Sequence, residues 1–304
     1  MTSVLALSQL QTFRQLALDR NFTRAAEALH LTQPAVSQQI RALERHFRVK
    51  LVDVAGRRMQ FTAAGSFLVN RAERLLDGVA ALEHDMREYA EAQIGELRLG
   101  ATVTIGSYGL GAIVARFRER HPRISLDVRV ANTSEIAHGV RSGALSLALV
   151  EGSLVDPALD ITPYAPDELV MIAPAAHRFG ASANPIAAAE IGAEPFVARE
   201  VGSGTRALFE EVLRAAGVEP NVVLALPTGE GIVQAVEAGV GIAIVSELVT
   251  RSAVAAGRVR RIPLAGLDFR RSFRLVRLKD VTASPAALAF AAMVLEPAGD
   301  PIAG

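Results

Sequence analysis

Short polar side chains and an arginine lie on one face of a predicted helix that begins near Thr32. Residues 22–41 have apolar side chains at helical spacing, and they read as two short helices joined by a tight turn. The buried side of the second helix carries Val36, Ile40 and Leu43. Its outward side then carries Ser37, Gln38 and Arg41. Hydroxyl, amide and guanidinium groups in one row can bind base edges in the DNA major groove, whereas an ordinary helical hairpin would only expose them to solvent.

The residues that begin this helix support the prediction. Thr32 can cap the helix with its hydroxyl, and Pro34 stands in the first turn, where a missing backbone N–H costs nothing. We expect Thr32 and Gln33 to anchor the start of the helix on DNA.

The charge of the chain is divided unevenly. Its 304 residues include 32 lysines and arginines and 32 aspartates and glutamates, so the net charge is zero. Residues 1–62 nevertheless hold nine basic and four acidic residues, which leaves the remainder acidic. A basic N-terminal segment would be attracted to DNA phosphates, while the acidic remainder of the chain would not.

One uninterrupted helix is expected from Thr62, a residue that can cap it, to about Glu91. Apolar residues recur along it in steps of four and three: Leu68, Ala72, Leu75, Val79, Leu82, Met86 and Tyr89. This spacing is typical of a two-stranded coiled-coil seam. The alternative is an amphipathic helix that packs against its own domain. We favour self-pairing, since a dimer of a small DNA reader binds the two half-sites of a palindromic operator.

Strand and helix patterns alternate after residue 94. Strands are expected at 96–101, 124–130 and 145–150, with helices at 106–119 and 134–141 between them. This order predicts a parallel sheet with crossover helices. A second set follows, with strands near 169–172, 196–198, 222–226 and 241–245 and helices near 205–216, 229–238 and 247–256. A strand at 273–277 and a helix at 285–295 complete two α/β lobes, which are expected to enclose a cleft.

Two segments at strand-to-helix junctions have the composition of an anion site. The first offers Thr102, Thr104 and Ser107, and the second offers Gly202, Ser203, Thr205 and Arg206. Backbone N–H groups at a helix start attract anions, hydroxyl groups orient them, and glycine lets the backbone approach closely. Ligands of α/β sheets lie at the carboxyl ends of strands, where both segments fall. The sequence predicts a small anionic effector there, although each segment alone could be a capped helix start without a ligand.

Patterns that accompany catalysis or metal binding are missing from the sequence. Gly202, Ser203 and Gly204 do not form the Gly-x-Ser-x-Gly nucleophile elbow, and Gly100 and Gly106 lack the intervening glycine of a dinucleotide site. The six histidines are scattered, and there is no cysteine. We therefore predict no catalytic residue, no metal and no cofactor.

The apolar runs are too short to span a membrane, and the first residues lack the pattern of a signal peptide. These two features predict a cytoplasmic protein without a membrane partner. The absence of cysteine fits that compartment.

Residues 10–65 resemble the winged helix-turn-helix of LysR-type transcriptional regulators. The resemblance is carried by Phe22-Thr23-Arg24-Ala25-Ala26-Glu27, Leu29, Thr32-Gln33-Pro34-Ala35-Val36-Ser37, Ile40, Leu43-Glu44, Gly56-Arg57-Arg58 and Thr62-Ala63-Ala64-Gly65. It implies that Arg57 and Arg58 lie on the wing and contact phosphate or the minor groove. Val52 and Val54 depart from the family pattern, which usually has Phe and Arg at these two positions.

The resemblance extends over nearly the whole chain. It implies that the long helix is a dimerisation linker, that a periplasmic-binding-protein-like effector domain follows, and that dimers assemble into tetramers. Segments 101–108 and 199–206 resemble the branch of the family that controls sulfur assimilation and carbon fixation. Three departures from the pattern bear on the ligand: Val201, Gly111 and Ser146.

The sequence thus predicts a ligand-gated, DNA-binding transcriptional regulator of mixed α/β fold. It would comprise a winged helix-turn-helix at residues 1–62, a linker helix at 63–93 and an effector domain at 94–304. Lobe I of that domain would take about 94–163 and 266–304, and lobe II about 164–265. Two alternatives remain open: a regulator whose C-terminal domain serves only for oligomerisation, and a solute-binding protein.

Overall fold

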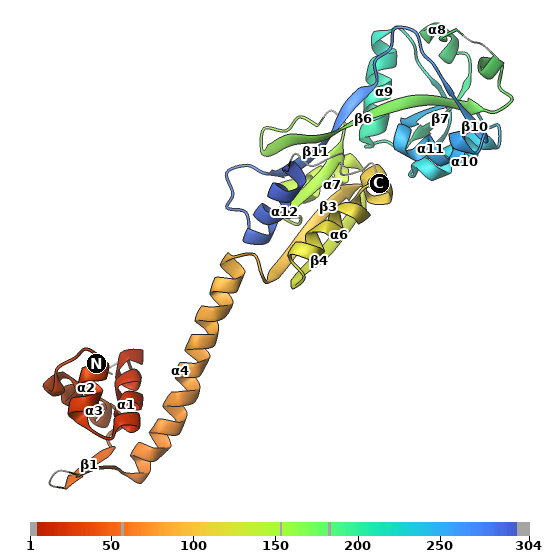
Figure 1. Ribbon diagram of the computed structural model, residues 1–304. Helices are drawn as coiled ribbons and strands as arrows, with labels where there is room; N and C mark the ends of the chain where they lie inside the picture. Colours follow the sequence, from red (N-terminus) through yellow and green to blue (C-terminus); the bar gives the residue numbers. More distant parts are fainter. Residues whose placement is uncertain (1–4, 56–57, 153, 182–183, 297–304) are drawn as a thin grey trace. The chain divides into compact units, whose positions relative to one another are not determined.

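Two units make up the chain, Met1–Glu88 and Tyr89–Gly304. The computed structural model describes residues 5–296 apart from 56–57, 153 and 182–183. Each unit has its own hydrophobic core, and the division between them falls near the end of the long helix α4 (Ala63–Ala90), as Figure 1 shows.

The N-terminal unit consists of three helices and a two-stranded hairpin. Its helices are α1 (Leu7–Asp19), α2 (Phe22–Ala28) and α3 (Gln33–Phe47). β1 (Val52–Ala55) pairs antiparallel with β2 (Arg58–Phe61), so the predicted winged helix-turn-helix is present. As expected from its sequence, Thr32 caps α3, because its Oγ1 accepts the N–H of Ala35 at 3.4 Å.

The long helix α4 begins where the sequence predicts. The hydroxyl of Thr62 accepts the N–H of Gly65 at 2.9 Å, which is an N-cap bond. The first turns of α4 complete the N-terminal core: Ala72 is 1% exposed, and Leu68 packs against the same cluster. Leu68 and Ala72, the first two residues of the predicted seam, therefore pack within the N-terminal unit, which leaves those from Leu75 onward for the predicted pairing.

The first lobe of the C-terminal unit is built on the predicted parallel sheet. β3 (Gly95–Thr102) pairs in parallel with both β4 (Ile124–Ala131) and β5 (Leu147–Glu151). The helices after these strands are α5 (Val103–Tyr108), α6 (Leu110–Arg120) and α7 (Thr133–Arg141). The single helix predicted at 106–119 is wrong, because Gly109, at φ −120° and ψ −30°, ends α5 and begins α6.

Two strands run from one lobe into the other. β6 (Leu159–Pro174) is much longer than the strand predicted near 169–172, and it pairs antiparallel with β11 (Arg270–Leu278). The register shifts between Phe273 and Arg274, which leaves Tyr164 of β6 as the extra residue of a bulge. Figure 1 shows this pair of strands passing between the lobes, so both lobes include part of it.

The second lobe adds helices and shorter strands to β6. β9 (Ala243–Ser246) and β10 (Val259–Ile262) pair antiparallel with β6, and β7 (Pro195–Arg199) pairs in parallel with β8 (Asn221–Leu226). The remaining helices are the 3-10 helix η1 (Arg178–Ala181), α8 (Ala188–Ile191), α9 (Gly204–Ala215), α10 (Gly229–Glu237), α11 (Glu247–Ala255) and α12 (Pro285–Leu295). The expected mixed α/β fold is confirmed, and β10 is an element that the sequence patterns did not reveal.

Candidate DNA-binding surface and effector site

The outward face of α3 lies where the sequence predicts. Gln38 and Arg41 are exposed and Ser37 is half-buried, while Val36, Ile40 and Leu43 fill the core beneath them. Gln33 donates from Nε2 to the Ser37 hydroxyl at 3.0 Å, so these two polar groups form one row along the helix.

A groove of about 410 Å³ separates this helix from the hairpin. Ser37 and Arg41 line one side of it, and Val52, Asp53 and Val54 of β1 line the other. Val52 is buried in the core and Val54 is 62% exposed, so only Val54 presents its side chain outward. Of the two predicted wing arginines, Arg57 lies outside the described residues and Arg58 begins β2 without a described side chain.

Glu44 fastens the hairpin to α3. Its carboxylate accepts the backbone N–H groups of Leu51 at 3.0 Å and Val52 at 3.4 Å, and Lys50 lies 3.2 Å away. Burial acts to raise the pKa of Glu44, but the hydrogen bonds from Leu51, Lys50 and Val52 outweigh it, so the pKa lies below its usual value. The carboxylate therefore fixes the position of the wing relative to the recognition helix.

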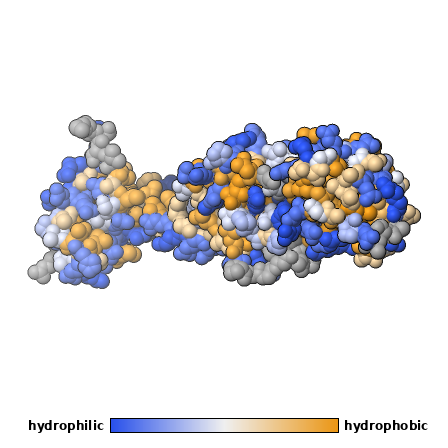
Figure 2. Space-filling model, turned by 90° about the horizontal axis from the view of Figure 1, so that it is seen from above, coloured by the Kyte–Doolittle hydropathy of each residue, from blue (hydrophilic) through white to orange (hydrophobic). Residues whose placement is uncertain are grey.

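The rest of the predicted seam is exposed on α4. Leu75, Leu82, Met86 and Tyr89 are between 41% and 61% exposed, and Val79 is half-buried. Figure 2 shows apolar side chains on this narrow helical segment. Large apolar side chains on a surface of this kind are typical of an interface with another chain.

The first predicted anion segment already holds a carboxylate of the protein itself. Thr102 precedes α5 as its N-cap residue, yet its hydroxyl makes no capping bond and donates instead to the carboxylate of Glu151. Both residues are 1% exposed. Thr104 is also buried, whereas Ser107 is exposed, so the three residues predicted here do not present one common surface.

The second predicted segment forms the start of α9 and touches the other lobe. The N–H of Gly204 donates to the hydroxyl of Thr133 at 3.0 Å, and that hydroxyl donates to the Glu151 carbonyl at 3.3 Å. Ser203 is the N-cap residue of α9, but its buried hydroxyl makes no hydrogen bond to any described residue. Gly202 has φ +91°, a conformation that favours glycine.

Arginines surround this helix start, and most of their N–H groups are paired. Arg199 donates to Glu200 at 2.8 and 2.9 Å, and Arg206 donates to Glu210 at 2.7 Å. Arg271 was not singled out by the sequence patterns. Its Nη1 donates to the Thr205 hydroxyl at 3.0 Å, which brings positive charge to the first turn of α9.

Arg271, which donates to Thr205, also forms a buried ion pair with Asp167. Arg271 Nε donates to Asp167 at 2.7 Å, and the hydroxyl of Ser246 donates to the same carboxylate at 2.7 Å. The Nη2 of Arg271 is buried without a hydrogen-bond partner in the described part of the chain. An acidic residue and an arginine on separate strands carry no sequence signal of their pairing, which is why these residues were missed.

A second contact joins the lobes through α5 and α10. The pKa of Tyr108 in α5 is raised well above its usual value, chiefly by burial and also by the nearby carboxylate of Glu230 in α10. This tyrosine belongs to the segment in which the sequence suggested a ligand, but its partner is a residue of the protein.

A pocket of about 260 Å³ lies at the start of α9. Thr133, Ser134 and Leu154 line it from the first lobe, and residues 201–204 with Arg206, Ala207 and Glu210 line it from the second. It therefore collects three of the predicted effector residues, Gly202, Ser203 and Arg206, with the N-terminal end of α9.

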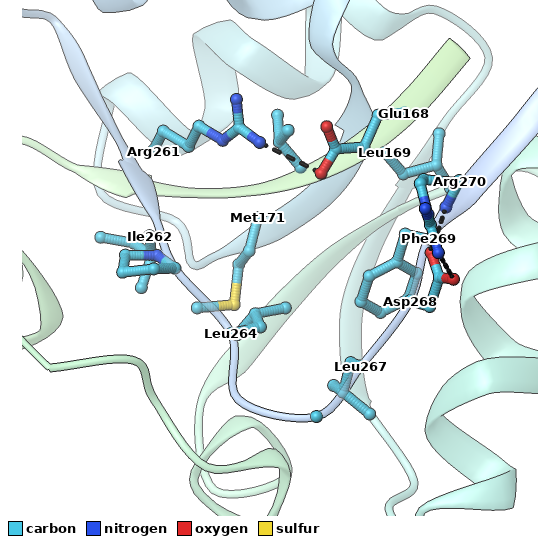
Figure 3. Close-up of a pocket in the computed structure, with 13 residues that line it drawn as sticks. Glu168, Leu169, Met171, Arg261, Ile262, Leu264, Leu267, Asp268, Phe269 and Arg270 are labelled. Atoms are coloured by element: carbon cyan, nitrogen blue, oxygen red, sulfur yellow. Dashed lines mark hydrogen bonds and ion pairs between the residues drawn. The ribbon is translucent and has the colours of Figure 1, made fainter. Parts of the chain in front are cut away.

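The pocket in Figure 3 is larger, about 380 Å³, but it lies away from every predicted site residue. Its rim charges are already paired, since Arg261 lies 3.1 Å from Glu168 and Arg270 lies 2.6 Å from Asp268. The α9 pocket is the better candidate for an anion, because it includes a hydroxyl without a partner.

Among the residues that the structure describes, no group of three histidine, cysteine, aspartate or glutamate side chains is placed to hold a metal ion. Within the same residues, no helix combines the length and the apolar character that crossing a membrane requires.

Two family descriptions match the chain. Residues 7–66 match the bacterial regulatory helix-turn-helix protein of the lysR family, and residues 90–298 match the LysR substrate binding domain. The HTH-type transcriptional regulator CysL of Bacillus subtilis is 32% identical over 242 residues, which cover 80% of this chain and 81% of CysL. A probable RuBisCO transcriptional regulator of Trichormus variabilis is 31% identical over 295 residues, which cover 95% of this chain and 87% of that protein.

Solved structures share the fold. Full-length CbnR, complexed with its target DNA, has a TM-score of 0.68 and 21% identity, covering 95% of this chain and 98% of CbnR. The regulatory domain of Synechocystis PCC6803 CcmR, in complex with 2-PG, has a TM-score of 0.61 and 25% identity, covering 66% of this chain and 96% of that domain.

Proposed function

This chain belongs to the LysR family of bacterial transcriptional regulators, and we propose that α3 reads its operator DNA. The outward row of polar groups on α3 carries the proposal. Ser37, Gln38 and Arg41 would bind base edges. Thr32, Gln33 and Pro34 would position the start of the helix against the DNA backbone. The excess of basic residues in this part of the sequence supports phosphate contact.

Arg41 and Arg57 provide a matched test of this division between base and backbone contacts. Arg41→Ala should relax sequence preference and cost about 1–3 kcal/mol on the cognate operator. Arg57→Ala should weaken binding to all sequences and reduce the salt dependence of binding. Titrations of cognate and random duplexes at several salt concentrations measure both effects. An equal loss on cognate and random DNA for Arg41→Ala would show that Arg41 does not read bases.

The same proposal places a small anion at the pocket of α9. Ser203 offers a hydroxyl without a partner among the described residues, the first turn of α9 beyond Gly204 offers backbone N–H groups, and Arg206 lines the pocket. Gly202 and Thr205 complete this side, whereas Thr102, Thr104 and Ser107 do not present a common surface and are left out of the proposed contacts. The 2-PG complex of the CcmR regulatory domain gives a precedent for a bound ligand in a similar domain.

Calorimetric titration of the full chain with small anions tests this part. Ser203→Ala should weaken anion binding about tenfold, since it removes one hydrogen bond to a charged group. Ser134→Ala is the matched control, because Ser134 lines the same pocket but is exposed. Binding that is unchanged by Ser203→Ala, or absent for every anion, contradicts the proposed site and favours a C-terminal unit that serves only for oligomerisation.

Dimer formation through α4 would place two copies of α3 on a palindromic operator, and pairs of dimers would form tetramers. An effector that binds one assembly state more tightly than another would shift the population between them. Sedimentation of the full chain with and without the bound anion, on operator DNA, measures that shift. The same distribution of species in both conditions would contradict gating through assembly.

A further inference from the structure

Glu151 is a buried carboxyl group with few partners. It ends β5, it is 1% exposed, and the hydroxyl of Thr102 is the one group among the described residues that donates to its carboxylate. A carboxylate can accept several hydrogen bonds, and its burial beside a single neutral donor is unfavourable. Its remaining acceptor positions have no hydrogen-bond donor among the described residues.

Glu151 also lies against the start of α9. A Cβ atom at Gly204 would meet the carbonyl oxygen of Glu151 at 2.3 Å, so only glycine permits this approach. Ser203, the preceding residue, is 3% exposed, and its hydroxyl has no partner within the described residues. The carboxyl group with few donors thus belongs to Glu151, whose backbone touches Gly204. The hydroxyl without a partner belongs to Ser203, the residue before Gly204.

Arg271 brings positive charge to the same face of the sheet. Phe273 is directly opposite Glu151 in the antiparallel pair of β5 and β11. Arg271 precedes Phe273 by two residues, so the Cβ atoms of Arg271 and Glu151 are about 7–8 Å apart by strand geometry. The Arg271 side chain is 4% exposed, and its Nη2 lacks an acceptor in the described part of the chain. Arg271 and Glu151 are therefore diagonal neighbours on the same face of this strand pair.

We infer that the effector carries a hydrogen-bond donor beside its anionic group, as hydroxy-carboxylates and amino-carboxylates do. The anionic group binds at Ser203, the first turn of α9 and Arg271, and the hydroxyl or ammonium group donates to Glu151. Acetate and sulfate have only acceptor oxygens to place against Glu151, so they bind weakly. This inference rests on the proposed anion site and adds Glu151 as the residue that determines specificity.

Calorimetric titration of the full-length protein with glycolate, glycine, acetate and sulfate tests the inference. Glycolate or glycine should bind at least about tenfold more tightly than acetate, the scale of one hydrogen bond to a charged group. Comparing glycolate with glycine shows whether a hydroxyl or an ammonium group is the preferred donor. Equal affinities for glycolate, glycine and acetate overturn the requirement for a donor but leave the anion site standing. If none of the four anions binds, the anion site itself fails, and the inference fails with it.

Variants of Glu151 assign the preference to this residue. Glu151→Gln should reduce the preference for a donor, because a neutral amide oxygen accepts more weakly than a carboxylate, and it should improve the binding of acetate and sulfate, because the amide N–H can donate to them. Glu151→Asp keeps the carboxylate and should keep the preference at lower affinity. Glu237→Gln, an exposed carboxylate paired with Arg258, is the control and should change nothing. Thermal unfolding of each variant identifies loss of folding, and a preference that is undiminished in folded Glu151→Gln overturns the assignment.

Discussion

Gly204 and Thr133 are 71 positions apart in the sequence, yet the N–H of Gly204 donates to the hydroxyl of Thr133 at 3.0 Å. Because Thr133 in turn donates to the carbonyl of Glu151, one hydroxyl connects the first turn of α9 to the end of β5. The contact joins the two lobes at the pocket proposed for the effector. The stability of this junction can be measured through the hydroxyl alone.

Thr133→Val keeps the shape of the side chain and removes the hydroxyl. The free energy of unfolding of the C-terminal unit should fall by about 1–3 kcal/mol, since a buried N–H loses its acceptor. Urea unfolding of the full chain measures the loss, and hydrogen exchange should show faster exchange at the Gly204 amide. Ser134→Ala is the control, because Ser134 is exposed and its backbone N–H donates to the Gly202 carbonyl. A Gly204 amide that stays equally protected in Thr133→Val would contradict the assignment of this bond.

Tyr108→Phe removes the hydroxyl whose pKa is raised by burial and by the nearby Glu230 carboxylate. At neutral pH the variant should be less stable by about 1 kcal/mol, the scale of one partly exposed hydrogen bond. The pKa of Tyr108 is raised from 10.0, so its contribution is fully present below pH 10 and is lost as the pH rises through the higher folded value. The stability difference between wild type and variant should therefore shrink above pH 10. Thermal unfolding across this range, with Tyr89→Phe as the control, measures it, and a difference that grows with pH would refute the contact.

Glu44→Gln removes the carboxylate that accepts the N–H groups of the wing. The N-terminal unit should lose about 1–3 kcal/mol at neutral pH, because hydrogen bonds to a charged acceptor are weakened. The pKa of Glu44 is lowered from 4.5, so its contribution is present above pH 4.5 and is lost as the pH falls through the lower folded value. The variant should therefore show a flatter loss of stability in acid. Chemical unfolding between pH 7 and pH 3 tests this, with the exposed Glu27→Gln as the control; parallel curves for wild type and Glu44→Gln would count against it.

Leu82→Glu places a charge on the exposed stripe of α4. A coiled-coil seam cannot bury an unpaired carboxylate, so the dimer should dissociate at least about tenfold more readily. Sedimentation equilibrium measures the dissociation constant. Ala80→Glu adds the same charge to the same helix outside the predicted seam and should leave the dimer intact. Equal effects of the two substitutions would show that the stripe is not the interface.

The elements that could be predicted from the sequence are those whose ends are marked by capping residues or prolines. The last helix begins after Ser284 and at Pro285, and the structure gives Pro285–Leu295, because a capping hydroxyl and a proline mark the first turn. The break at Gly109 was missed, since a glycine within an apolar pattern is compatible with a continuing helix. The full length of β6 was missed as well, because Pro163 and Pro166 suggest a loop where the strand has a bulge and an edge.

The candidate site was predictable in part for a related reason. Gly202, Ser203 and Arg206 were recognised because they are neighbours in the sequence, and they do line one pocket. Glu151 and Arg271 were not, because their roles depend on partners that are brought close only by the sheet. The carboxylate that occupies the first predicted segment is 49 positions from Thr102, and no local pattern reveals such a contact.

The pairing of β6 with β11 has a mechanical consequence for the C-terminal unit. The two lobes are joined by paired strands from Leu278 opposite Leu159 to Arg270 opposite Glu168, with the bulge at Tyr164 between them. A ladder of this kind resists stretching and sliding, but it can change its twist, and a bulge is the point at which twist is most readily altered. The strand pair therefore opposes stretching and sliding of one lobe against the other, and Tyr164 marks the place where the pairing changes register.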